Sequence, residues 1–153
     1  MSSSPNLLIV DAHFYSDIAD ELVRGAVARI DSSGASFERV SVPGALEIPV
    51  VIGYALLANE KTGRNCRFDG FVVLGCVIRG ETSHYDHVCF ESIHGVQDLA
   101  LKYSLALGNG ILTCENREQA WARAAVDQGN KGGAAASAAL ELIKIRDTFV
   151  QKT

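Results

Sequence analysis

"FDGFVVLGCVI", residues 68–78, is the stretch of sequence that decides the fold. From Phe71 to Ile78 every residue is apolar or small, so both sides of an extended chain would be apolar. Such strands are typical of the centre of a parallel sheet, where helices cover both faces. The stretch therefore predicts an α/β protein.

Outward from this stretch, the chain alternates between strand and helix patterns. The predicted architecture is a three-layer flavodoxin-like sandwich with a four-stranded parallel sheet covered by helices on both faces, because such alternation implies right-handed crossovers. We expect Ser16 and Asp17 to cap the first helix. The predicted strands are 6–12, 35–42, 68–78 and 110–114, and the predicted helices are 16–31, 47–60, about 90–107, 117–125 and 132–149, with tight packing at 132–139.

Composition limits the class of protein. A length of 153 residues favours one domain, 1–153. The net charge is -4 and the 14 basic residues are scattered, which argues against a nucleic-acid partner. No apolar run approaches the roughly 18 residues of a membrane span. The opening "MSSSPN" lacks the pattern of a secretory signal, so we expect a cytoplasmic protein.

The cysteines form no CxxC pair, and we expect reduced and mostly buried thiols. An alternative is a metal site at residues 84–89, where His84 and His87 would share one helix face. Asp86 would then point elsewhere and no fourth ligand is evident, so no metal is expected. The cysteines are Cys66, Cys76, Cys89 and Cys114.

Ligands of parallel α/β sheets bind beyond the carboxyl ends of the strands. The loops to consider are therefore 11–15, 43–47, 77–87 and 114–118. In the first of them, Phe14 follows the end of a strand. Its ring could stack on a planar heterocycle, or it could pack in the core, and the residues alone leave both interpretations open.

The second loop begins with a turn-forming Pro43-Gly44 pair, which could turn the backbone groups of Ala45 and Leu46 toward a ligand. Glu47 follows among apolar neighbours. Its carboxylate could accept hydrogen bonds from ligand hydroxyls, or it could cap its own helix.

The third loop combines Gly80, Thr82 and Ser83 just before a predicted helix, a pattern that suits a phosphate group. His84 is the candidate general acid or base, because imidazole titrates near neutral pH. Near the last loop, Arg123 could complete a phosphate clamp together with the cationic Lys131. The alternative for Arg123 is a solvated helix face with an ordinary ion pair, and the alternative for His84 is a structural role.

Four blocks of the sequence resemble the 6,7-dimethyl-8-ribityllumazine synthase family. They are "VPGALEIP" (42–49), "GCVIRGETSHYDHVCFES" (75–92), "GILTCENREQAWARA" (110–124) and "NKGG" (130–133), in the family's order and spacing. The resemblance implies condensation of 5-amino-6-(D-ribitylamino)uracil with 3,4-dihydroxy-2-butanone 4-phosphate. It implies no metal and no organic cofactor.

The resemblance also implies roles for individual residues. His84 would move protons, and Glu81 (through its amide), Thr82 and Arg123 would bind the butanone phosphate. For Arg79, in the same stretch, we expect structural hydrogen bonding of the loop and no part in the chemistry. The residues implied for the ribitylaminouracil are Phe14, Ala45, Leu46, Glu47, Cys76, Val77, Ile78, Asn109 and Lys131.

Three positions depart from the common family pattern and bear on affinity and packing: Asn109 where a Phe is frequent, Tyr15 for an Asn, and Ala134 for an acidic residue.

Family members form homopentamers with active sites at subunit interfaces, and some form 60-subunit shells, which the short "AAVDQG" connection permits. Riboflavin synthase is a candidate partner. The alternative function is a non-catalytic flavin- or lumazine-binding protein, or a shell-forming paralogue.

Overall fold

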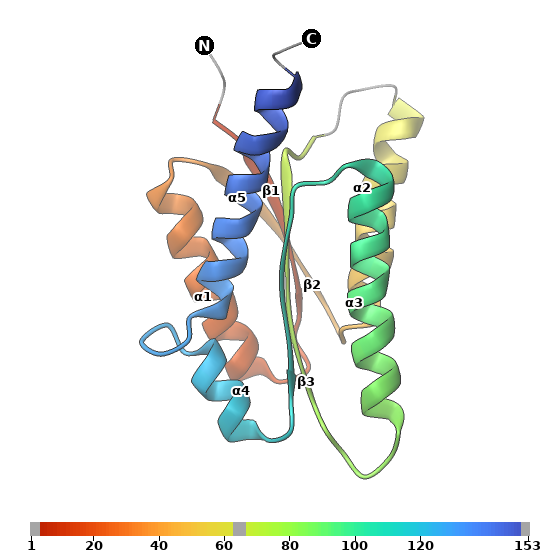
Figure 1. Ribbon diagram of the computed structural model, residues 1–153, viewed down its shortest axis with the longest axis vertical. Helices are drawn as coiled ribbons and strands as arrows, with labels where there is room; N and C mark the ends of the chain where they lie inside the picture. Colours follow the sequence, from red (N-terminus) through yellow and green to blue (C-terminus); the bar gives the residue numbers. More distant parts are fainter. Residues whose placement is uncertain (1–3, 63–66, 151–153) are drawn as a thin grey trace.

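The computed structural model describes residues 4–62 and 67–150, and its core is one parallel sheet of strand order β2-β1-β3-β4. Figure 1 shows α1, α4 and α5 on one face of the sheet and α2 and α3 on the other, which confirms the predicted three-layer fold. The strands are β1 (Asn6–Ala12), β2 (Ser36–Val42), β3 (Gly70–Ile78) and β4 (Leu107–Cys114), and the helices are α1 (Ser16–Ser32), α2 (Glu47–Thr62), α3 (His84–Tyr103), α4 (Arg117–Ala124) and α5 (Lys131–Val150).

Strand β3 occupies the centre of the sheet, as its sequence predicts, because it pairs with both β1 and β4. Its first seven residues are buried. Val72 and Leu74 belong to the core beneath α1 and α5, whereas Phe71 and Val73 belong to the core beneath α2. One apolar stretch therefore supplies both layers of core.

Helix α5 packs very closely on α1 and β4, and glycines make this contact possible. A Cβ atom at Gly132 would lie 1.9 Å from the carbonyl oxygen of Leu22, and one at Gly108 would lie 1.8 Å from that of Ala135. Any side chain at these two positions would force the elements apart. The expectation of tight packing at the start of the last helix is confirmed.

Some predicted boundaries were wrong. Helix α3 begins at His84, not near residue 90, because the polar residues at its start lie on the solvent side of the helix. It ends at Tyr103, where Ser104 takes a left-handed conformation (φ 53°), and β4 consequently begins at Leu107. The expected caps of α1 are also wrong, since Tyr15 holds the N-cap position and makes no side-chain capping bond.

The described cysteines are free thiols. Cys76 and Cys114 are buried and Cys89 is half-buried, while the prediction for Cys66 falls outside the described residues. Burial raises the pKa of Cys76 to about 12, so this thiol stays protonated at neutral pH. Within residues 4–62 and 67–150, no helix is both long and apolar enough to cross a membrane.

Candidate active site

A cavity of about 420 Å³ lies at the carboxyl ends of the strands, next to the first turns of α2 and α3. All of its lining residues except Cys76 and Val88 come from three of the four loops selected from the sequence, so the prediction of where a ligand binds agrees with the shape of the molecule. The predicted site residues that line it are Phe14, Ala45, Leu46, Glu47, Cys76, Val77, Ile78, Thr82 and His84.

Phe14 presents its ring to the cavity instead of packing in the core. The side chain is 72% exposed, and its ring meets Tyr15 edge to face with the ring centroids 4.9 Å apart. The alternative of a core aromatic is therefore wrong. An exposed ring at a cavity wall is suited to stack on a planar heterocycle.

The second wall is the turn that joins β2 to α2. The amide of Glu47 donates to the carbonyl oxygen of Gly44 (3.2 Å), and that of Ile48 donates to Ala45 (3.2 Å). A Cβ atom at position 44 would lie 3.1 Å from a carboxylate oxygen of Glu47, so glycine leaves room for that carboxylate. The sequence therefore places an acidic side chain at the mouth of the cavity.

The carboxylate of Glu47 accepts no hydrogen bond from any residue in the described part of the chain, and the side chain is exposed. The alternative in which Glu47 caps its own helix finds no support, because capping requires a bond to a backbone N–H group of α2. The carboxylate is therefore available to accept hydrogen bonds from a bound molecule.

The third wall is the loop from β3 to α3. Helix α3 has 20 residues and begins at His84, so its positive N-terminal end lies beside Thr82. The amide of His84 donates to the Thr82 hydroxyl (3.3 Å). The His84 ring is exposed and has no hydrogen-bond partner among the described residues, which leaves both ring nitrogens available. Glu81 is exposed beside Thr82 but does not line the cavity.

Arg79 ties this loop to its surroundings, as the sequence predicts. Its Nε donates to Glu115 (2.7 Å) and its Nη1 to Asp86 (3.4 Å). The guanidinium also lies 4.3 Å from the centroid of the Tyr85 ring. These contacts join the loop to the end of β4 and to the first turn of α3.

Three predicted site residues lie away from the cavity. The Asn109 side chain, on the edge strand β4, accepts a hydrogen bond from the amide of Ile111 (2.9 Å). Arg123 lies on α4 and donates to the carbonyl oxygen of Gln119 (3.1 Å), and Lys131 is exposed at the start of α5. Figure 1 shows α4 and α5 on the face of the sheet opposite to α2 and α3.

Sequence reasoning missed several residues that line the cavity. Most of them adjoin predicted ones, so the loop boundaries alone were a sufficient signal, whereas Val88 required knowing that α3 begins at His84. The missed residues are Tyr15, Pro43, Gly44, Tyr85 and Val88, whereas Gly80, which also lines the cavity, was part of the predicted phosphate loop.

The metal alternative receives no support from the geometry. In the described residues, no three His, Cys, Asp or Glu side chains come together in a way that could hold a metal ion. His84 instead lines the cavity, and Cys89, which lies in the same stretch of sequence, lines a second hollow together with Tyr85 and Asp86.

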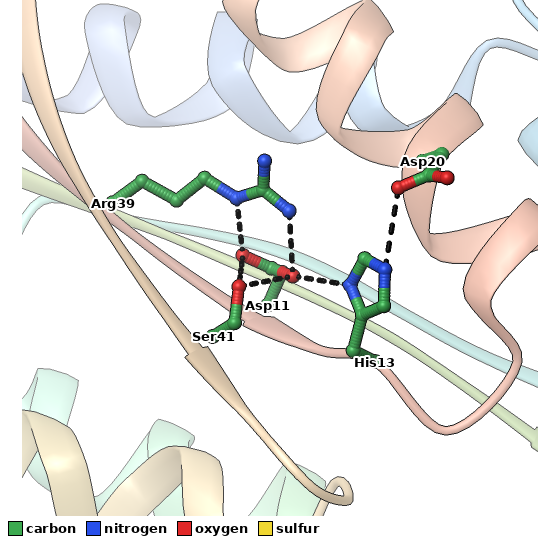
Figure 2. Close-up of polar contacts among 5 residues, drawn as sticks. All are labelled: Asp11, His13, Asp20, Arg39 and Ser41. Atoms are coloured by element: carbon green, nitrogen blue, oxygen red, sulfur yellow. Dashed lines mark hydrogen bonds and ion pairs between the residues drawn. The ribbon is translucent and has the colours of Figure 1, made fainter.

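Figure 2 shows a polar cluster at the end of β1, centred on Asp11, which is fully buried. Arg39 donates to both carboxylate oxygens (2.8 and 3.1 Å), and the Ser41 hydroxyl lies 3.1 Å from each. His13 links Asp11 (3.0 Å) to Asp20 of α1 (3.3 Å). Burial raises the pKa of Asp11, but the bonds from Arg39 and His13 outweigh it and hold the pKa below its usual value.

Known proteins resemble the chain over most of its length. A family model described as 6,7-dimethyl-8-ribityllumazine synthase matches residues 4–147. A protein of Rhizobium meliloti named 6,7-dimethyl-8-ribityllumazine synthase 1 is 54% identical over 141 residues, which are 92% of this chain and 91% of the relative. An Agrobacterium fabrum protein named 6,7-dimethyl-8-ribityllumazine synthase is 51% identical over 144 residues, 94% of this chain and 96% of the relative.

Proposed function

The chain belongs to the 6,7-dimethyl-8-ribityllumazine synthase family, and we propose how its cavity carries out the reaction of that family. The protein is a transferase of riboflavin biosynthesis. It condenses 5-amino-6-(D-ribitylamino)uracil with 3,4-dihydroxy-2-butanone 4-phosphate, and it releases 6,7-dimethyl-8-ribityllumazine, phosphate and water.

The ribitylaminouracil occupies the part of the cavity between Phe14 and the turn at the start of α2. The exposed Phe14 ring stacks on the pyrimidine, and the backbone of residues 76–78 runs along its edge. Ala45 and Leu46 flank the ribityl chain. The unpaired carboxylate of Glu47 accepts hydrogen bonds from ribityl hydroxyls, which are donors of matching chemistry.

The butanone phosphate occupies the other part of the cavity, at the N-terminal end of α3. Thr82 offers a hydroxyl, and Glu81 offers its backbone amide beside the positive end of a 20-residue helix. The anionic phosphate gains both hydrogen bonds and a favourable electrostatic interaction there.

His84 moves the protons of the condensation. The amino group of the uracil attacks the ketone carbon, and the carbonyl oxygen leaves as water when the imine forms. Loss of a proton from the neighbouring carbon accompanies departure of phosphate, and the resulting enol becomes a new carbonyl group. The ribitylamino nitrogen attacks this carbonyl carbon to close the ring, and the carbonyl oxygen leaves as a second water. His84 lines the cavity beside Thr82 with both ring nitrogens available, so it can accept and return these protons. Holding both substrates in one cavity makes the reaction effectively unimolecular.

A second copy of the chain completes the site. Asn109, Arg123 and Lys131 carry chemistry suited to the two substrates but do not line the cavity of their own chain. We infer that a neighbouring subunit brings them to it in a homopentamer. Large exposed apolar side chains on α2 and α3, Tyr54 (65%) and Phe90 (64%), suit a contact between copies.

The proposal extends to the domain organisation, the cellular compartment and the partners of the enzyme. Residues 1–153 form one lumazine synthase domain, which acts in the cytoplasm, where its free thiols remain reduced. Native mass spectrometry distinguishes a pentamer from a 60-subunit shell, and co-purification tests riboflavin synthase as a partner.

One observation carries the proposal: nine predicted site residues, from three separate segments of the chain, line a single cavity. The test is to mix the protein with both substrates and to follow lumazine formation by absorbance against the uncatalysed reaction. We expect an enzyme-dependent rate. Binding of the ribitylaminouracil without acceleration would favour the non-catalytic alternative.

A further inference from the structure

The Asp11 cluster lies directly behind two walls of the cavity. Strands β1 and β2 pair with Asp11 opposite Ser41, and the last contact of this ladder joins the amide of His13 to the carbonyl oxygen of Val42 (2.9 Å). One residue further along each strand, Phe14 and Pro43 line the cavity. The cluster therefore holds the two strand ends from which both walls project.

Phe14 has little packing of its own to fix it. Its side chain is 72% exposed, and within the described residues its one aromatic ring contact is with Tyr15. The position of the ring consequently depends on the backbone at residue 13. His13 is held from both sides, because Nδ1 lies 3.0 Å from Asp11 and Nε2 lies 3.3 Å from Asp20. Figure 2 shows this bridge from the end of β1 to α1.

Asp11 does not contact the cavity itself. Side chains along β1 point alternately to the two faces of the sheet, so Asp11 shares a face with Ile9 and Leu7. Ile9 and Leu7 belong to the core beneath α1 and α5. The cavity opens on the other face of the sheet, at the first turns of α2 and α3. Any influence of Asp11 on a ligand must therefore pass through the strand ends.

Stability alone is a poor explanation for the cluster. Removing a carboxylate from water is costly, and replacement of buried ion pairs by apolar side chains is often neutral or stabilising. The Asp11 carboxylate instead fixes a geometry. It bonds to Arg39, Ser41 and His13, and each bond restricts the position of one of these side chains.

The other part of the cavity has a separate support. Arg79, through Glu115 and Asp86, holds the loop that carries Thr82 and His84. This support uses none of the residues of the Asp11 cluster. A substitution that breaks the hydrogen bonds of the Asp11 cluster should therefore displace Phe14 and the turn after β2, while the phosphate end of the cavity keeps its shape.

We propose that Asp11 is a positioning residue for the heterocyclic substrate, acting through His13 on Phe14 and through Ser41 on the turn that leads to Glu47. This inference rests on the proposed function, because it names the part of the reaction that the cluster serves. The phosphorylated substrate lies outside its influence.

The first test is Asp11→Asn, which keeps the shape of the side chain but leaves an amide nitrogen that cannot accept from His13 or Arg39. We expect the KM and the dissociation constant for ribitylaminouracil to rise about tenfold. The KM for butanone phosphate should stay at the parent value. Glu38→Gln is the matched control, because Glu38 lies on β2, the strand that pairs with β1, and the substitution breaks only an exposed ion pair with Arg67.

A second pair of variants uses His13, whose side chain is only 33% exposed. His13→Ala removes both bonds of the bridge. His13→Asn places an amide nitrogen near the former Nδ1 position and can still donate to Asp11. We expect the alanine variant to weaken ribitylaminouracil binding and the asparagine variant to recover part of the loss, a rescue that a nonspecific loss of stability would not produce.

Binding of ribitylaminouracil alone, measured by calorimetry, separates this inference from the proposed function. A parent protein that binds the uracil without turning over both substrates would contradict the proposed function, and the comparison of variants would still test the inference. Equal uracil binding by the parent, Asp11→Asn and His13→Ala would overturn the inference. Equal weakening of both substrates would overturn it as well.

Discussion

Glu47→Gln isolates the interaction of one carboxylate with substrate. No described residue donates a hydrogen bond to this carboxylate, so the substitution breaks no bond within the folded chain. The carboxylate also interacts favourably with the positive end of α2, an interaction worth at most about 1 kcal/mol. That change shifts the midpoint of thermal unfolding by about 2–4 °C or less in a chain of this size.

The effect on substrate should be much larger. A hydrogen bond to a charged group contributes about 1.5–3 kcal/mol. At 1.4 kcal/mol for each factor of ten, the KM for ribitylaminouracil should rise about 10- to 100-fold. The KM for butanone phosphate should not change, because the proposed site of that substrate is the α3 end of the cavity.

The assay is steady-state lumazine formation with each substrate varied in turn, beside a thermal unfolding curve. Glu60→Gln is the matched control, since it makes the same chemical change at the far, exposed end of the same helix. An unchanged KM for ribitylaminouracil would refute the assignment of Glu47. If the free energy of unfolding fell by as much as the free energy of substrate binding, the carboxylate would have a structural role instead.

Three further outcomes are expected. His84→Ala should lower kcat by about 10²- to 10⁴-fold with normal thermal unfolding, as measured in single-turnover and steady-state assays, and retention of the parent kcat would contradict its role. Gly132→Ala should destabilise the protein by about 3 kcal/mol or more in urea unfolding, because the added Cβ meets a carbonyl oxygen of α1 at 1.9 Å, and an unchanged midpoint would show that α5 can move aside. The lowered pKa of Asp11 means that its contribution to stability is present above the usual carboxylate pKa and is lost as pH falls through the folded-state value, so the parent should lose more stability on acidification than Asp11→Asn in urea titrations at several pH values.

The sheet was predictable because its sequence signals are local. The apolar run from Phe71 to Ile78 is typical of a central strand, and glycines 132 and 133 pointed to close packing. The start of α3 was missed because polar residues on the exposed side of a helix resemble a loop in a linear reading. Gly108 falls between the predicted helix and the predicted strand, and the close packing of Ala135 on it explains why β4 carries a glycine there.

The site was predictable where its residues follow strand ends, as Phe14 and Thr82 do. The Asp11 cluster was not, because it depends on the register that places Asp11 opposite Ser41 and on the turn that brings Asp20 to His13. Neither the strand register nor the contact between Asp20 and His13 can be predicted from the order of residues in the sequence.

The most direct test of the account mixes two inactive variants. If His84 of one copy and Arg123 of its neighbour serve one site, then His84→Ala and Arg123→Ala subunits, dissociated and reassembled together in equal amounts, should form intact sites at about a quarter of the interfaces. Lumazine formation should return to about that fraction of the parent rate, while each variant reassembled alone stays at its own low level. A mixture no more active than the two variants separately would contradict a site shared between copies.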